Sequence, residues 1–348
     1  MNLSAGKLWS LRRLADANGR FKMVAADQRP PIMSLIKQKR NVATASYDDV
    51  AWFKEILVKS LTDEASAVLL DPIWAYSRAV AHVAPTQGLL LTLEEHDFQE
   101  TDGGRLSRDI DGWTVGKIRR VGADGVKVLA WYRPDASPEV CARQQEYVER
   151  IGKACAEHDI CFLLELLVYP LPNEAGQTKD YIEHSAKRPE LVVKSLETFA
   201  DPRFGVDIFK LESPLAAVNV PELGAAGADE CQHWFNELGR VANRPWVMLS
   251  AGADMDQFRR VLKYAYAAGA SGYLAGRAIW LQAARAFPDG AAMEAALRKD
   301  ALSYMREINE LTDARARPWM AHSAFADGVA IKGAGAEFPK KYAEAGRG

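Results

Sequence analysis

Two lysines and a glutamate stand inside strongly apolar stretches of the sequence. Lys127 lies in GVKVLAWY, Lys210 in VDIFKLESP and Glu165 in CFLLELLVY. Removing an ammonium or a carboxylate from water is unfavourable unless the group is paired or used in chemistry. For a single buried lysine, an ion pair with a nearby carboxylate is as good an explanation as a role in chemistry. Two such lysines together with Glu165 favour a reaction centre.

A buried lysine amine can attack a ketone to form a covalent intermediate. The attack needs the neutral amine, and at the reference pKa of about 10.4 an amine is neutral less than ~0.1% of the time at pH 7. Burial and a second cation nearby both favour the neutral form, and two strand lysines offer that arrangement. Burial should also raise the pKa of Glu165 unless a lysine pairs with it, which would suit a carboxyl that shuttles protons during carbinolamine dehydration.

The elements that must position these residues follow from the hydrophobic pattern. Short apolar runs recur at intervals of about 20 to 45 residues, each followed by a stretch with helical periodicity, as in a parallel sheet wrapped by helices. Eight runs match a closed (β/α)8 TIM barrel, an α/β fold, better than an open doubly wound sheet. The runs are 21–27, 66–71, 88–94, 125–132, 161–169, 206–214, 245–252 and 272–280.

The two ends of the chain are expected to lie outside the barrel repeat. We predict one barrel domain over residues 1–320, with residues 5–18 forming an extra helix that caps the barrel floor. Residues 321–348 are rich in Gly, Ala and Lys and lack a sustained pattern. We predict that they form a C-terminal tail that is either flexible or an oligomer arm.

Composition and charge limit the partners. The 44 basic and 46 acidic residues give a net charge of -2 and no broad cationic surface for nucleic acid or anionic lipid. No apolar run approaches the ~20 residues that span a bilayer, and the N-terminus lacks the apolar stretch of a secretory signal, so we expect a cytoplasmic protein. The four cysteines show no CxxC spacing and are expected to be reduced.

In a barrel of this kind the chemistry sits at the C-terminal ends of the strands. The residues at or near these ends in this sequence are Asp27, Gln28, Arg29, Glu94, Glu95, Lys127, Arg133, Glu165, Lys210, Glu212, Ser250, Gly252, Gly276 and Arg277. The loops after the last two runs read SAGADM and AGRAIW, and such loops are the usual phosphate site of these barrels.

Each part of this predicted phosphate site has an ordinary explanation when it is taken alone. Ser250 supplies a hydroxyl, and Gly252 and Gly276 let the backbone approach an anion closely. Arg277 offers a charge-assisted fork, although it could instead pair with a surface acid. Because these residues fall on adjacent loops after the right strands, the sequence favours phosphate.

Metal catalysis is the main mechanistic rival, and it needs imidazole or carboxylate ligands at the open face. Of the six histidines, only His96 follows one of the predicted strands. A lone histidine there is more often a hydrogen-bonding loop residue than a ligand. We therefore predict no metal and no cofactor.

The sequence resembles the tagatose 1,6-bisphosphate aldolases of the lactose and galactose phosphate pathway, which are class I barrel enzymes. The resemblance covers roughly residues 8–319. It rests on motifs that occur in the family's order: ADQR (26–29), SAVLLDP (66–72), GADGVKVL (122–129), YVERIGKAC (147–155), FLLELLVY (162–169), RFGVDIFKLESP (203–214), LSAG (249–252) and LAGRAIW (274–280). Of these, RFGVDIFKLESP and the DQR motif are strongly specific, whereas the glycine-rich pieces are weak.

The resemblance implies a set of residue roles and a reaction. It places the Schiff-base lysine on Lys210 and the proton-transferring glutamate on Glu165, with Asp27 and Lys127 beside the reacting carbons. The implied contacts to phosphate or hydroxyl groups come from Gln28, Arg29, Ser250 and Arg277. The implied reaction is reversible, metal-independent cleavage of a ketose 1,6-bisphosphate, with tagatose 1,6-bisphosphate as the first choice, to dihydroxyacetone phosphate and glyceraldehyde 3-phosphate.

Two departures from the family pattern bear on the substrate. Pro30-Pro31 replaces a small Gly-Ala pair, and the bulky stretch 131–134 replaces an acidic one. The related sulfofructose-1-phosphate aldolases share the DQR, Schiff-base and LAGRA features, so a 6-sulfo or other 6-substituted ketose phosphate is an alternative. Arg133 would hold a sulfonate as readily as a phosphate.

An alternative of another class is a non-catalytic sugar-phosphate sensor on the same barrel. Nothing in the sequence favours it, since the reactive residues are all retained. Our leading hypothesis remains an aldehyde-lyase that binds a small phosphorylated ketose and forms a homo-oligomer.

Overall fold

The computed structural model describes residues 2–176, 183–184 and 186–342. Eight parallel strands close into a barrel in the order β10-β11-β2-β3-β4-β7-β8-β9. The strands are β2 (Phe21–Ala25), β3 (Ala67–Leu70), β4 (Gly88–Thr92), β7 (Gly125–Trp131), β8 (Cys161–Leu167), β9 (Ile208–Leu211), β10 (Trp246–Met248) and β11 (Gly272–Ala275). Each strand falls within one of the eight apolar runs, so the predicted barrel is confirmed.

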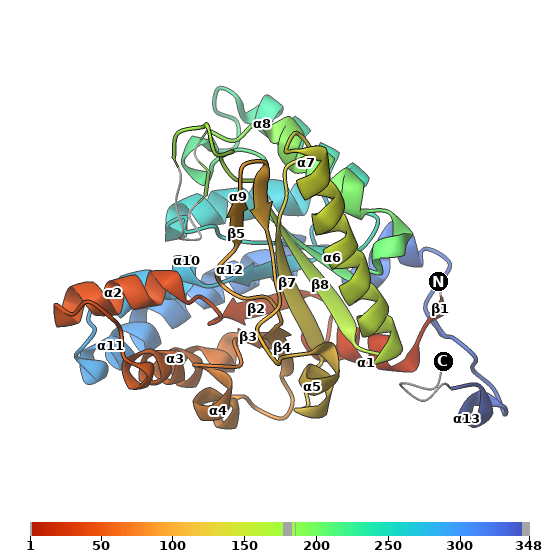
Figure 1. Cartoon of the computed structure of the whole chain (residues 1–348), viewed down its shortest axis with the longest axis horizontal. Helices are drawn as coiled ribbons and strands as arrows, with labels where there is room; N and C mark the ends of the chain where they lie inside the picture. Colours follow the sequence, from red (N-terminus) through yellow and green to blue (C-terminus); the bar gives the residue numbers. More distant parts are fainter. Residues whose placement is uncertain (1, 177–182, 185, 343–348) are drawn as a thin grey trace.

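Helices follow the strands and form the outer layer of the barrel (Figure 1). They are α2 (Pro30–Arg40), α3 (Tyr47–Leu61), α4 (Tyr76–Ala79), α5 (Val115–Arg120), α6 (Pro138–Glu157), α7 (Pro189–Phe199), α8 (Ala228–Val241), α9 (Met255–Ala267), α10 (Arg277–Ala284), α11 (Gly290–Ala296) and α12 (Leu302–Arg315). Helix α3 begins where the Ser46 side chain accepts a hydrogen bond from the backbone N–H of Asp49. Helix α9 begins with a reciprocal capping box between Asp254 and Gln257. These caps explain why the two segments start where they do.

The core has an outer layer between strands and helices and an inner layer at the barrel floor. The floor cluster includes Phe21, Leu90 and Leu163 from three strands. Leu11 and Leu14 of α1 (Ala5–Leu14) pack against it. The predicted floor-capping helix is therefore present, although it ends at Leu14 rather than at residue 18.

The first part of the predicted tail packs against the floor of the same chain. Phe325 is buried in the floor cluster, and His322 is buried beside it in sequence. Strand β12 (Ala330–Ile331) pairs in parallel with β1 (Asn2–Leu3). Residues 343–348 lie outside the described part of the chain, and a role for the tail in assembly stays a prediction.

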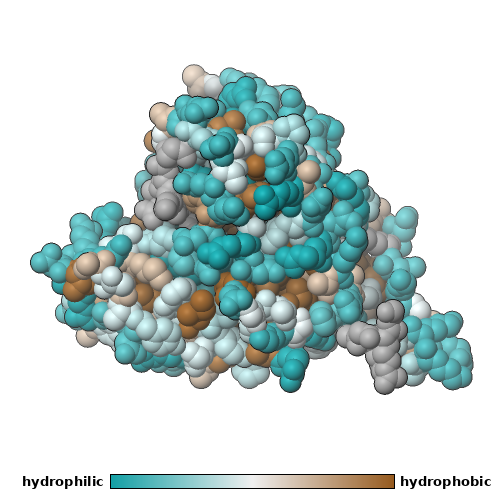
Figure 2. Space-filling model, viewed as in Figure 1, coloured by the Kyte–Doolittle hydropathy of each residue, from teal (hydrophilic) through white to brown (hydrophobic). Residues whose placement is uncertain are grey.

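Two smaller elements complete the fold. Strands β5 (Gln99–Thr101) and β6 (Gly104–Leu106) form a hairpin between β4 and β7, and α13 (Phe338–Lys341) lies near the C-terminus. The face seen in Figure 2 is mostly hydrophilic, with only small hydrophobic areas. Among the described residues, no helix combines the length and apolar character needed to cross a bilayer.

Candidate active site

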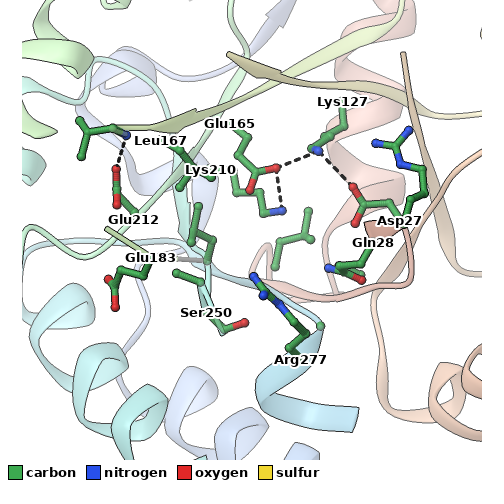
Figure 3. Close-up of a pocket in the computed structure, with 17 residues that line it drawn as sticks. Asp27, Gln28, Lys127, Glu165, Leu167, Glu183, Lys210, Glu212, Ser250 and Arg277 are labelled. Atoms are coloured by element: carbon green, nitrogen blue, oxygen red, sulfur yellow. Dashed lines mark hydrogen bonds and ion pairs between the residues drawn. The ribbon is translucent and has the colours of Figure 1, made fainter. Parts of the chain in front are cut away.

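The C-terminal ends of the barrel strands surround a pocket. Nine of the ten predicted site residues line it: Asp27, Gln28, Arg29, Lys127, Glu165, Lys210, Ser250, Gly276 and Arg277 (Figure 3). The tenth, Gly252, lies against the Arg277 guanidinium instead. The barrel topology thus brings together residues that are up to 250 positions apart in the sequence.

Lys210 and Glu165 face each other across two neighbouring strands. They are paired in register between β9 and β8, and the Lys210 Nζ lies 3.0 Å from Glu165 Oε2. Both side chains are buried. A primary amine is therefore held in hydrogen-bond contact with a carboxylate at the bottom of the pocket, which is the arrangement needed for proton exchange between the two.

The Lys127 ammonium lies among three carboxylates. Its Nζ is 3.0 Å from Asp27 Oδ2, 2.6 Å from Glu94 Oε1 and 2.9 Å from Glu165 Oε2. Its side chain is 2% exposed, so water screens these interactions little. Lys127 therefore links Glu165, the partner of Lys210, to the acids that follow β2 and β4.

The lysines decide the ionisation of the two pocket carboxyls. Burial alone would raise the pKa of Glu165, but the charges of Lys127 and Lys210 outweigh it and hold the pKa below its ordinary value. Burial likewise opposes ionisation of Asp27, and Lys127, Lys210 and Arg29 together hold its pKa below the ordinary range. From the sequence we expected burial to raise the pKa of Glu165 unless a lysine paired with it, and the structure shows that pairing. Asp27 and Glu165 are both proton acceptors at neutral pH.

Arg29 is directed toward Glu94. Its Nη1 donates to the backbone carbonyl of Glu94 at 3.0 Å, and its Nη2 lies 3.6 Å from Glu94 Oε1. Thr92 Oγ1 also donates to Glu94 Oε2, at 2.8 Å. Although Arg29 lines the pocket, the contacts seen here fix Glu94 beside Lys127, a role that the sequence did not assign to Glu94.

The opposite rim of the pocket is built from the loops after β10 and β11. Gly252 has a φ of 91°, and an added β-carbon would lie 3.3 Å from the Arg277 guanidinium carbon. A β-carbon at Gly276 would lie 2.7 Å from both Ala25 O and Gln28 Nε2. Gly252 is therefore favoured by its positive φ, and Gly276 by its close approach to the backbone carbonyl of Ala25. Arg277 is the first residue of α10, so its side chain and the helix N-terminus offer one place for an anion.

Gln28 brings an acceptor to the same pocket. Its Oε1 is buried, and no hydrogen-bond partner for this atom exists among the described residues. Buried polar atoms in native proteins are normally satisfied. A donor group on a ligand, such as a sugar hydroxyl, would satisfy this one.

A family model for DeoC/LacD family aldolases matches residues 22–282, which is most of the chain. The chain belongs to the DeoC/LacD family of aldolases. The family resemblance predicted from the sequence is thereby confirmed, and the aldolase is a lyase.

Relatives of this aldolase match it over most of their length. Tagatose 1,6-diphosphate aldolase 1 of Enterococcus faecalis is 33% identical over 283 residues, covering 80% of this chain and 85% of the relative. Tagatose 1,6-diphosphate aldolase of Lactococcus lactis subsp. lactis is 32% identical over 333 residues, covering 92% and 99%.

Solved structures share the fold of the aldolase at low identity. A fructose-bisphosphate aldolase from Plasmodium falciparum has a TM-score of 0.63 and 13% identity, covering 91% of this chain and 98% of that one. An archaeal fructose 1,6-bisphosphate aldolase has a TM-score of 0.56 and 16% identity, covering 88% and 99%. These likenesses support the barrel alone.

The aldolase pocket has an acidic wall that sequence reasoning missed in part. Glu183 and Glu212 line the pocket, and the buried Lys187 contacts both carboxylates. Glu212 was recognised as a polar residue near a strand end, without a role. Lys187 and Glu183 lie between β8 and α7, outside any periodic segment, and no signal in the sequence pointed to them.

Two other residues considered in the sequence, Arg133 and His96, contact nearby acids in the structure. Arg133, suggested as a ligand for a second anionic group, lies outside this pocket, and its guanidinium is bound by Asp135 and Glu174. His96 contacts its neighbour Glu95, and this hydrogen bond lowers the pKa of Glu95 to about 2. In the described ranges, no three His, Cys, Asp or Glu side chains are grouped so as to hold a metal ion.

Proposed function

We propose that this aldolase reversibly cleaves a ketose 1,6-bisphosphate to dihydroxyacetone phosphate and glyceraldehyde 3-phosphate through a Schiff base on Lys210. The observation that carries the proposal is the buried Lys210 and Glu165 pair at the base of the pocket. The names of the relatives support tagatose 1,6-bisphosphate as the substrate. The rim at Ser250 and Arg277 suits the 1-phosphate.

The first half of the reaction forms the iminium. Lys210 Nζ attacks the C2 carbonyl, and Glu165, 3.0 Å away, is placed to take the proton that the amine releases. The same carboxyl returns this proton to the C2 oxygen, which gives the carbinolamine. A second proton, taken up from solvent through the carboxyl, lets the C2 hydroxyl leave as water and leaves the positive charge on the iminium. Lys127, 2.9 Å from Glu165, favours the ionised form of the carboxyl before the first transfer and after the last one.

The second half breaks the bond between C3 and C4. A carboxylate removes the proton of the C4 hydroxyl, the C3–C4 electrons move into the iminium to give an enamine, and the aldehyde leaves. Asp27 and Glu165 both stand beside Lys127 as ionised acceptors, and either can serve as this base. Protonation of C3 and hydrolysis of the iminium by water then release dihydroxyacetone phosphate and free Lys210.

The proposal is tested by trapping the iminium. Borohydride added with dihydroxyacetone phosphate should reduce it to a stable secondary amine, and mass spectrometry should find the added mass on the peptide containing FKLESP. Lys210→Ala should abolish the label. A label on Lys127 would exchange the roles of the two lysines, and the absence of a label on either would contradict a class I mechanism.

The substrate and the metal requirement need separate measurements. Turnover of tagatose and fructose 1,6-bisphosphates and of sulfofructose 1-phosphate decides the C4 configuration and the group at C6. We propose that the enzyme needs no metal, so exhaustive chelation should leave its activity intact, and a loss restored by Zn²⁺ would contradict this. A cytoplasmic location and a homo-oligomeric state likewise stay predictions.

A further inference from the structure

Glu183 and Glu212 form an acidic wall on one side of Lys210, while Asp27 and Gln28 lie on the other side (Figure 3). Glu212 follows β9 directly and stands two residues after Lys210. Residues two apart on a strand face the same side of a sheet. Glu212 is therefore a potential second carboxylate partner for the Lys210 ammonium.

The structure engages both oxygens of Glu212 elsewhere. Lys187 Nζ lies 2.8 Å from Glu212 Oε2. The backbone N–H of Val168 donates to Glu212 Oε1 at 2.7 Å. Since Val168 directly follows β8, this contact also ties the exit of β8, the strand that carries Glu165, to the exit of β9.

The oxygens of Glu183 are engaged in the same way. Lys187 Nζ lies 2.6 Å from Glu183 Oε1, and the backbone N–H of Ala217 donates to Glu183 Oε2 at 2.8 Å. The Lys187 side chain is 0% exposed, so water and salt screen this bridge little. Both carboxylates of the acidic wall thus depend on one ammonium.

The charges of the bridge support each other. Burial lowers the pKa of Lys187, but Glu212 and Glu183 outweigh it and raise the pKa above its ordinary value, so Lys187 stays a cation. Burial raises the pKa of Glu212, and Lys187 opposes that rise. Without Lys187, Glu212 would need another cation, and Lys210 stands on the same strand face.

We propose that Lys187 is a positioning residue that keeps Glu212 and Glu183 from pairing with Lys210. This inference rests on the proposed Schiff-base function. Because Lys187 holds Glu212 and Glu183, Lys210 retains Glu165 as its direct carboxylate partner. An amine with additional carboxylate partners keeps its proton to higher pH. Lys187, which does not line the pocket itself, therefore sets the pH at which the nucleophile becomes available.

The other charged groups of the pocket stay the same in this comparison. Outside the acidic wall, those that line it with Lys210 are Asp27, Arg29, Lys127, Glu165 and Arg277. The variants below change the acidic wall or its cation only, so a shift in pH dependence reports on that wall.

The test measures the pH at which trapping by borohydride with dihydroxyacetone phosphate is half-maximal, using the full chain and intact mass. Lys187→Met should raise this midpoint by about one pH unit, since an uncompensated carboxylate at close range has an effect of that size. The double variant Lys187→Met with Glu212→Gln should move the midpoint back toward the wild-type value. Lys187→Arg, which keeps the charge, should stay near the wild type.

Glu183→Gln should shift the midpoint of trapping in the direction opposite to that of Lys187→Met. It does so without leaving a buried charge unpaired. It removes one carboxylate and leaves Lys187 with Glu212 alone, so the midpoint should fall by about half a pH unit. This variant decides the matter if Lys187→Met does not fold. Reduced trapping at every pH with an unchanged midpoint would show that the bridge is only structural and would overturn the proposal. Failure of the Schiff-base function is distinct, because the wild type itself would then carry no adduct.

Discussion

Lys210 and Glu165 are direct neighbours in the register of β9 and β8, with their polar atoms 3.0 Å apart. A shift of one residue in either strand would turn one of the two side chains toward the helices. The register is set by the apolar residues on the helix side of the same strands, among them Phe209 and Leu164, which are fully buried. Packing of the barrel therefore fixes the distance between the amine and its proton acceptor.

The rim of the pocket gives the first prediction. Arg277→Ala should raise KM for a 1-phosphorylated ketose at least about tenfold, because a charge-assisted contact contributes ~1.5 to 3 kcal/mol. Steady-state kinetics measure the effect. Arg285→Ala, at the exposed end of the same helix, is the matched control and should leave KM unchanged. A wild-type KM in Arg277→Ala would remove this residue from the phosphate site.

The location of the site could be predicted from the sequence because it depends on topology. Residues at the C-terminal ends of parallel strands meet at one end of a barrel wherever they stand in the chain. Lys127, Glu165 and Lys210 could therefore be placed together from their positions in three apolar runs. Their catalytic roles rest on the proposals above.

The remaining features depend on contacts that leave no periodic signal. Lys187 contacts Glu183, four residues before it, and Glu212, which lies beyond α7. Only the folded loop brings the three side chains together. Arg29 turns toward Glu94 and Arg133 toward Asp135, although both arginines follow strands as phosphate ligands do. The position of a residue on or after a strand fixes where its side chain begins. The direction of a long basic side chain depends on the carboxylates around it.

His322 gives a prediction for stability against pH. Its Nε2 lies 3.1 Å from Ala242 O, and its Nδ1 accepts from the backbone N–H of Ala324 at 3.2 Å, so the folded chain holds the neutral ring. Burial, together with the nearby Arg317, lowers the pKa of His322 to about 4.

The sign of the pH effect follows from proton binding. Between about 4 and the unfolded value of about 6.5 the unfolded chain binds more protons at this site, so stability is full above about 6.5 and falls as the pH drops. His322 should account for a loss of about 2 kcal/mol between pH 7.5 and pH 5, measured by urea unfolding. His322→Gln should flatten this dependence, whereas His233→Gln, at an exposed position on α8, should keep it. Equal slopes in all three proteins would contradict the prediction.

The last prediction concerns Lys127 and the three carboxylates that surround it. In the wild type the pKa values of Asp27 and Glu165 lie below their ordinary values, so the stability they contribute is present above about pH 4 and is lost as the pH falls through the folded values. Lys127→Met removes the ammonium and leaves buried carboxylates uncompensated. At pH 8 the free energy of unfolding should fall by about 3 to 5 kcal/mol.

At pH 5 the loss in Lys127→Met should be smaller, because carboxyls without a cation take up protons more readily and then no longer need one. Urea unfolding at the two pH values measures the difference. Adding Glu94→Gln to Lys127→Met should recover part of the loss at pH 8, since one of the orphaned charges is then absent. If the loss were equal at both pH values and Glu94→Gln recovered nothing, Lys127 would stabilise the barrel through packing rather than through the three ion pairs seen here.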